Sequence, residues 1–170
     1  MSALTMHDLN GLSAARFRDV LAGIFERSPW VAEAVTPQRP FASVEQLHAA
    51  MCKAVAAAPP EQRLELLRAH PDLAGKEAQQ GTLTQSSTGE QKSAGLDRLS
   101  RAEMETIARN NDAYKKRFGF PFIICVRNHD TAGIFAAFEQ RLSNSRNAEF
   151  EAALREVYEI ARLRLEMLLR

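Results

Sequence analysis

Four polar side chains have the types that acid–base chemistry and anion binding require: His70, Ser87, Glu90 and Arg127. Histidine is the side chain whose ordinary pKa lies closest to neutrality, so an imidazole held in place suits proton transfer. A carboxylate can assist such a histidine, and a guanidinium matches carboxylates with two parallel hydrogen bonds. These residue types indicate a candidate pocket for proton transfer on a small polar molecule.

His70 lies in the stretch Ala69-His70-Pro71-Asp72-Leu73, after a leucine-rich segment, Glu61 to Arg68, that is predicted to be helical. The bulk of Pro71 disfavours the α conformation at His70, so the helix is expected to end there. Leu73 can then anchor the turn against a core. This pattern predicts an imidazole held on a stiff corner at a helix end; the alternative is an ordinary turn histidine with satisfied hydrogen bonds.

Ser87 and Glu90 are three residues apart, and this spacing is also typical of a capping box at the start of a helix. The structural and functional interpretations are compatible, because the free N–H groups of a helix N-terminus bind anions. Arg127 ends the most apolar run of the chain, Phe120 to Val126. The alternative for Arg127 is a surface salt bridge, which contributes little to stability.

Apolar residues at helical spacing, together with capping and stop signals, predict helices along most of the chain. The segment from Gly75 to Ser86 lacks such a pattern and is expected to be an exposed, mobile loop. The run Phe120 to Val126 has no second strand to pair with, so we expect buried extended or partly helical chain. The fold class predicted is all-α, a single compact domain over residues 1–170 with about eight helices and no sheet. The expected helices are 13–26, 29–35, 43–58, 60–70, 87–96, 100–119, 131–142 and 148–170.

Composition excludes several classes of function. The chain has 170 residues, 45% hydrophobic and 25% charged, as in ordinary globular domains. Its net charge of +1 gives no global field that would favour nucleic acid or an anionic membrane. No apolar stretch reaches membrane-spanning length, and the segment from Met1 to Asn10 does not resemble a signal peptide.

Neither the cysteines nor the histidines predict a metal site. Cys52 and Cys125 are far apart and lie among apolar residues, so we expect buried free thiols in a reducing compartment. His7, His48 and His129 have no evident partners and are expected to be structural or exposed. No zinc-binding spacing and no glycine-rich nucleotide-binding loop is present.

The motifs of the sequence go further than these spacings. They resemble those of the OHCU decarboxylases, the 2-oxo-4-hydroxy-4-carboxy-5-ureidoimidazoline decarboxylases of urate breakdown, and the resemblance covers nearly the whole chain. The stretches that carry it are Ser28-Pro29-Trp30-Val31, His70-Pro71-Asp72-Leu73-Ala74-Gly75-Lys76, Ser87-x-x-Glu90-Gln91-x-x-Ala94-Gly95-Leu96, Asn111-x-x-Tyr114-x-x-Arg117-Phe118-Gly119-Phe120-Pro121-Phe122-Ile123, and Glu159-Ile160-Ala161-Arg162-Leu163-Arg164-Leu165.

This resemblance implies an all-α homodimer that forms (S)-allantoin and carbon dioxide without a metal or an organic cofactor. The ending Leu168-Leu169-Arg170 is not a peroxisomal signal, so a bacterial cytoplasmic enzyme is expected. The resemblance assigns catalytic roles to His70 and Glu90. It implies that the substrate is bound by Pro71, Ser87, Thr88, Gly89, Gln91, Phe122, Ile123, Ile124, Cys125, Val126 and Arg127.

The substrate's own chemistry fits these residues. It carries a hydroxyl and a carboxylate on one ring carbon beside a C=N bond, which accepts the electrons released with carbon dioxide. We expect His70 to act as general acid or base with help from Glu90, and Arg127 to bind polar groups. The carboxylate is expected to face the apolar Phe122 and Ile123. The alternatives are a non-enzymatic helical module that docks through its last helix and a hydrolase of a related ureide.

Overall fold

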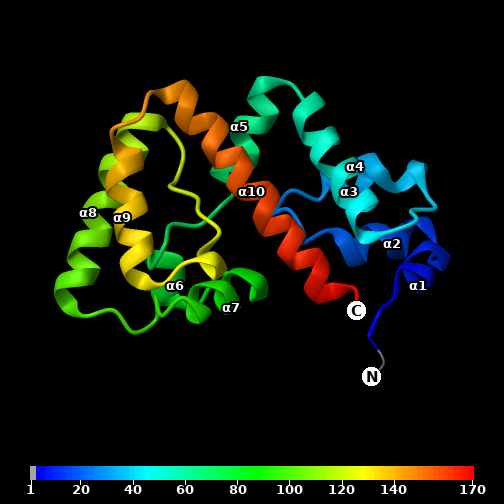
Figure 1. Cartoon of the computed structure of the whole chain (residues 1–170), viewed down its shortest axis with the longest axis horizontal. Helices are drawn as coiled ribbons and strands as arrows, with labels where there is room; N and C mark the ends of the chain where they lie inside the picture. Colours follow the sequence, from blue (N-terminus) through cyan, green and yellow to red (C-terminus); the bar gives the residue numbers. More distant parts are fainter. Residues whose placement is uncertain (1–2) are drawn as a thin grey trace. The chain divides into compact units, whose positions relative to one another are not determined.

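The computed structural model describes residues 3–170, and these residues are helical with no β-sheet, which confirms the all-α prediction (Figure 1). Their one β-type contact is an isolated bridge between Leu4 and Leu169. The expectation that no signal peptide begins at Met1 falls partly on Met1 and Ser2, which lie outside the described residues. The elements are α1 (Met6–Gly11), α2 (Ala14–Leu21), α3 (Trp30–Val35), η1 (Thr36–Gln38), α4 (Val44–Ala57), α5 (Pro60–Arg68), α6 (Lys76–Gln80), α7 (Gln85–Ser93), α8 (Arg101–Phe118), η2 (Val126–Asn128), α9 (Thr131–Leu142) and α10 (Arg146–Leu168).

The chain divides into two compact units. The terminal unit contains the residues up to Ala69 together with Tyr158–Arg170, and the central unit contains His70–Val157. The chain therefore passes from one unit to the other after α5 and again within α10. The prediction of a single domain over residues 1–170 stays a prediction. Within residues 3–170, no helix combines the length and the hydropathy needed to cross a membrane.

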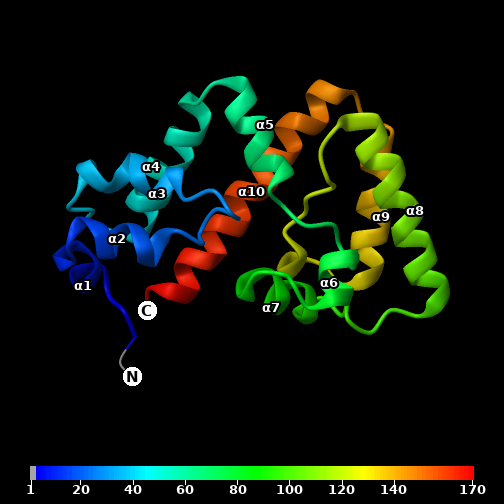
Figure 2. The same cartoon turned by 180° about the vertical axis from the view of Figure 1, so that it is seen from behind.

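The terminal unit is built on α3 packed against α4, with α2 beside α3 (Figure 2). Phe17, Val31 and Leu47 are completely buried in its core. An ion pair is buried there as well, because Nη2 of Arg164 lies 2.8 Å from Oε2 of Glu26. The final turns of α10 thus belong to this core.

Four helices start at a polar side chain that caps their N-terminus. Ser13, Ser43, Ser100 and Asp130 each accept a hydrogen bond from a backbone N–H in the first turn of the following helix. At Ser100 the capping box is complete, since Glu103 also accepts from the N-cap amide. Caps of this kind are worth about 1 kcal/mol each, so they fix where these helices begin.

Three predicted boundaries are wrong. The first long helix ends at Leu21 and not at Glu26. The segment expected to be a loop contains α6, which stops where Gly81 adopts a left-handed φ of 71°. Helix α7 begins at Gln85 and is capped by Thr84, so Ser87 is not its N-cap. Thr84 prevails because its hydroxyl already accepts the hydrogen bond from the Ser87 amide, at 3.2 Å.

In the central unit, α8 and α9 lie side by side and run in the same direction (Figures 1 and 2). The chain between them must therefore return along the unit, and residues 120–125 do so as buried, non-helical chain, as expected. Gly119, with φ of 81°, ends α8 and lets the chain reverse. This return segment delivers Arg127 to η2.

Candidate active site

All of the predicted site residues belong to the central unit, where they occupy three segments. These are the His70 corner (His70–Gly75), helix α7 and the run from Phe122 to Arg127. Helix α7 packs against η2. A methyl group placed on Gly89 would lie 3.5 Å from Nη2 of Arg127, so the guanidinium rests against the helix at its glycine. The second and third segments are therefore neighbours.

The His70 corner begins directly after Ala69, the C-cap of α5, as predicted. His70, Pro71 and Asp72 are half-buried, whereas Leu73 and Ala74 are buried. Ala74 has a φ of 49°, in the left-handed region that costs a non-glycine residue about 1–2 kcal/mol. A Cβ on Gly75 would lie only 2.6 Å from Cβ of Asp72, so the turn needs glycine there. The corner is tight and strained.

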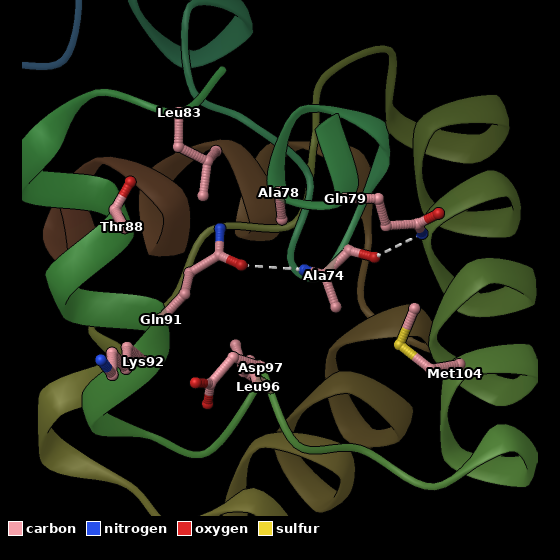
Figure 3. A pocket seen from close by; sticks show the side chains of 10 residues that line it. All are labelled: Ala74, Ala78, Gln79, Leu83, Thr88, Gln91, Lys92, Leu96, Asp97 and Met104. Atoms are coloured by element: carbon pink, nitrogen blue, oxygen red, sulfur yellow. Dashed lines mark hydrogen bonds between the residues drawn. The ribbon is translucent and has the colours of Figure 1, made fainter. Parts of the chain in front are cut away.

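Gln91 of α7 holds this strained turn. Its Oε1 accepts a hydrogen bond from the Ala74 amide at 2.9 Å, and its Nε2 donates to the Asp72 carbonyl at 3.3 Å. Gln79 adds a third bond, from its Nε2 to the Ala74 carbonyl at 3.2 Å (Figure 3). Both ends of the Gln91 carboxamide are thus engaged with backbone. Gln91 was predicted to bind substrate, and that role stays a prediction.

Helix α8 holds the same turn from another direction. Nδ2 of the buried Asn111 donates to the Leu73 carbonyl at 2.9 Å. Nζ of Lys115 lies 2.7 Å from Oδ2 of Asp72, so Asp72 forms an ion pair with α8. Sequence spacing did not identify Asn111 and Lys115 as supports, because they lie 38 and 43 residues from their partners. The Asn111 motif quoted above was the only signal for Asn111.

The predicted residues of α7 differ in exposure. Ser87 is buried, Glu90 is half-buried, and Thr88 and Gly89 are exposed. The amides of Ser87 and Thr88 already donate to Thr84, to its hydroxyl and its carbonyl respectively. Free N–H groups for an anion are therefore not available at Ser87, and any contact with substrate would use side chains.

The segment from Phe122 to Val126 is buried throughout, and its Phe122 ring packs in the core of the unit. That ring stacks on Phe138 with centroids 3.9 Å apart and meets the edge of Tyr114. The amide of Cys125 donates to Oε2 of Glu156 at 3.1 Å. Arg127 follows as an exposed side chain, and no ion pair joins it to another described residue.

A buried polar network centred on Glu149 packs beside the run from Phe122 to Val126. Glu149 is completely buried and accepts hydrogen bonds from the Tyr114 hydroxyl, from Nε of Arg141 at 3.0 Å and from Nδ2 of Asn144 at 2.9 Å. Burial alone would raise the pKa of Glu149, but the hydrogen bonds from Arg141, Tyr114 and Asn144 outweigh it and lower that pKa. Burial and the adjacent carboxylate raise the pKa of Tyr114. The network therefore stays charged on Glu149 and neutral on Tyr114.

The remaining candidate groups give no metal site among the described residues. Within residues 3–170, no three His, Cys, Asp or Glu side chains are grouped so that they could hold an ion. Cys52 and Cys125 form no disulfide; Cys125 is buried, and the half-buried Cys52 places its Sγ 3.3 Å from Nε2 of His48. Burial raises the pKa of the Cys52 thiol to about 11, so it is unreactive near neutral pH.

A pocket of about 290 Å³ opens beside α7 in the central unit (Figure 3). Of the predicted site residues, Thr88 and Gln91 line it. Its other lining residues come from the His70 corner, α6, α7, the start of α8 and the links between these helices, and five of the eight are apolar. They are Ala74, Ala78, Gln79, Leu83, Lys92, Leu96, Asp97 and Met104.

Comparison with known proteins shows the family of the chain. The family model for OHCU decarboxylase matches residues 10–166. The chain is 46% identical over 165 residues to a 2-oxo-4-hydroxy-4-carboxy-5-ureidoimidazoline decarboxylase of Haloferax volcanii, covering 97% of this chain and 96% of that one. It is 38% identical to the Xenopus laevis protein of the same name, covering 95% of this chain and 93% of that one.

Two solved structures have a similar fold. A crystal structure of (S)-allantoin synthase superposes with a TM-score of 0.79 and 34% identity, over 98% of this chain and 54% of that one. A crystal structure of OHCU decarboxylase in the presence of (S)-allantoin has a TM-score of 0.71 over 88% of this chain and 96% of that one; at 24% identity it shows the shared fold. The chain belongs to the OHCU decarboxylase family.

Proposed function

We propose that this protein removes carbon dioxide from 2-oxo-4-hydroxy-4-carboxy-5-ureidoimidazoline and releases (S)-allantoin, a step of urate degradation. The observation that carries this conclusion is the match to decarboxylases of that name over nearly the whole chain. The enzyme is a carboxy-lyase. The non-enzymatic module and the ureide hydrolase, considered from the sequence, have no comparable support.

The reaction needs no external electron acceptor. As the bond between the ring carbon and the carboxylate breaks, its electron pair forms a C=C bond to the neighbouring carbon, and the C=N nitrogen takes up the displaced pair with a proton. The product of this step is an enol. One proton must then reach the neighbouring carbon from a single face, while the hydroxyl proton leaves to give the carbonyl. The protein's task is therefore to direct protons.

His70 is the group proposed to move these protons, with Glu90 assisting it. Its support is the His70 corner, which fixes the residue after Ala69 and ties the following turn to α7, the helix that carries Glu90. Ser87 and Arg127 are proposed to bind polar groups of the substrate. Arg127 suits this role because its guanidinium is exposed beside α7.

The wall of the site is proposed to be Pro71 and the run from Phe122 to Val126. Because the side chains of this run are buried and the Phe122 ring is packed in the core, its contribution to binding is assigned mainly to its backbone. Thr88, Gly89 and Gln91 complete the proposed contacts along α7. An apolar environment at the carboxylate favours loss of its charge as carbon dioxide leaves.

The oligomeric state and location are proposals of the same kind. We expect a homodimer that acts in the cytoplasm on a free small molecule, without metal or organic cofactor. The whole chain is proposed to work as one domain. The net charge of +1 gives no reason to expect nucleic acid or a membrane surface as a partner.

The test uses freshly prepared ureidoimidazoline substrate and two simultaneous readouts. Released carbon dioxide is trapped, and the handedness of allantoin is followed by circular dichroism. The proposal expects one carbon dioxide per (S)-allantoin, faster than spontaneous decay. Ring opening without carbon dioxide would establish a hydrolase instead, and racemic allantoin at the spontaneous rate would establish that the protein is no catalyst of this step.

A further inference from the structure

We infer that Asn111 is a positioning residue for His70, which it places relative to α7 by holding the carbonyl of Leu73. The inference rests on the proposed function, in which His70 moves the protons. Asn111 lies on α8 and contacts the turn three residues after the histidine. It is therefore not itself a catalytic residue, since it acts through the backbone of the His70 corner.

The turn that Asn111 holds would not keep its shape unaided. Ala74 is in the left-handed region, and a strained backbone of this kind persists only where its surroundings over-determine it. Gln91 binds the amide of Ala74 and the carbonyl of Asp72, and Asn111 binds the carbonyl between them. Two consecutive peptide groups, 72–73 and 73–74, are thus held by side-chain amides from two different helices.

The position of His70 follows from this clamp. Pro71 fixes φ at its own position and restricts the conformation of the preceding residue, so it transmits the placement of Asp72 to His70 with little freedom. Helix α7 supplies one half of the clamp through Gln91 and also carries Ser87 and Glu90. Asn111 therefore helps to set the distance between the imidazole and the side chains with which it is proposed to work.

The chemistry of Asn111 favours a role in placement over one in stability. It is buried, and within the part of the chain that the structure describes, its Oδ1 has no hydrogen-bond partner. A buried acceptor left unpaired offsets the gain from the one hydrogen bond that Nδ2 makes. A fold that needed only packing here would do as well with an apolar side chain of the same size.

The experiment compares Asn111→Leu and Asn111→Asp with matched changes at the adjacent Asn110, which is half-buried on the same helix. Asn111→Leu removes the donor and keeps the number and branching of the side-chain heavy atoms. Asn111→Asp keeps the shape and replaces the donor with an oxygen. Asn110→Leu and Asn110→Asp control for the effect of each new side chain on α8. Rates are expressed per folded molecule, with the folded fraction taken from circular dichroism at the assay temperature.

We expect both Asn111 variants to fold and to lose about tenfold to a hundredfold in kcat, the range that a misplacement near 1 Å produces. KM should change less than twofold, because Ser87 and Arg127 do not depend on this bond. Both Asn110 variants should match the wild type. An equal fall in folded fraction and in rate, with kcat per folded molecule unchanged, would show a purely structural role and overturn the inference.

A second readout does not depend on activity. The imidazole resonances of His70, assigned by their loss in His70→Asn, should shift in the Asn111 variants and remain in place in the Asn110 variants. Unshifted His70 resonances in both folded Asn111 variants would refute the inference even if the wild type makes (S)-allantoin. If the His70 resonances shift in the Asn111 variants but the wild type makes no (S)-allantoin, the placement of His70 would be upheld and the proposed function rejected.

Discussion

Arg141 donates a hydrogen bond of 2.6 Å from its Nη1 to the carbonyl oxygen of Ile123. The same guanidinium lies over the Phe122 ring at 4.5 Å and forms an ion pair with the completely buried Glu149 at 2.9 Å. One side chain thus joins α9, α10 and the run that leads to Arg127. The predicted binding segment is positioned by a charge inside the core.

Removing that guanidinium should be costly. Arg141→Met leaves Glu149 buried without its cation, and breaking a buried pair in this way costs about 3–5 kcal/mol. The free energy of unfolding, measured by urea denaturation, should fall by that amount. Arg162 offers a control, because its ion pairs, with Glu159 and Glu166, lie at the surface. Arg162→Met should cost less than about 1 kcal/mol; equal losses in the two variants would contradict this account of the network.

Because Glu149 belongs to this network, the stability of the protein should decrease at acidic pH. The folded pKa of Glu149 lies below its ordinary value of 4.5. Its contribution to stability is therefore present above the unfolded pKa and is lost as pH falls through the lower, folded pKa. Urea midpoints measured between pH 3 and pH 7 should fall more steeply in acid for the wild type than for Glu149→Gln. Glu151→Gln, at an exposed position of the same helix, should keep the wild-type slope; parallel curves for all three proteins would be inconsistent with this assignment.

In the His70 corner, replacing Gly75 with alanine should lower the stability of the protein, whereas replacing Ala74 with glycine should not. Gly75→Ala forces a Cβ to within 2.6 Å of Asp72 and should destabilise the protein by about 1–3 kcal/mol. Ala74→Gly relieves a left-handed alanine and should be neutral or stabilising by up to about 1 kcal/mol, since the added freedom of the unfolded chain offsets part of the gain.

Gly11→Ala is the control for these variants, because nothing lies within 4 Å of the added methyl. Thermal unfolding compares all three. A Gly75→Ala protein as stable as Gly11→Ala would show that the turn can relax without cost, and the strain assigned to the corner would be wrong.

Both ends of α8 were predictable because they depend on neighbours in the sequence. Ser100 and Glu103 are three residues apart, and Gly119 ends its own helix, so local rules located both. The start of α7 was mispredicted by the same rules, since Thr84 and Ser87 both satisfy the pattern of an N-cap and only the fold decides between them.

The supports of the site could not be predicted from spacing. Asn111 holds Leu73 from 38 residues away, and the Tyr114 hydroxyl donates to Glu149 from 35 residues away. The spacing of residues in the sequence cannot predict such pairs, because each depends on how α8 packs against the rest of the unit. The residues that carry the proposed chemistry were identified instead by type and by family resemblance, and the structure adds the contacts that hold their segments in place.

Arg127 should contribute to substrate binding and little to the fold. It is exposed, and among residues 3–170 it has no ion-pair partner to lose. Arg127→Ala should raise KM by about tenfold to a hundredfold, the equivalent of one charge-assisted hydrogen bond, with an unchanged unfolding midpoint. Arg127→Lys should recover part of the loss, since it restores the charge without the bidentate geometry. Arg109→Ala, at an exposed position of α8, is the control; an unaltered KM in Arg127→Ala would remove Arg127 from the site.

The most direct test of the whole account measures the rate of (S)-allantoin formation by circular dichroism for the wild type, His70→Asn and His129→Asn. His129 is an exposed histidine of the same unit and serves as the matched control. Because proton transfer by a positioned side chain is worth about a hundredfold to ten-thousandfold, His70→Asn should lose at least a hundredfold in turnover while remaining folded, and His129→Asn should lose nothing. Near-normal formation of (S)-allantoin by folded His70→Asn would contradict the central role given to His70.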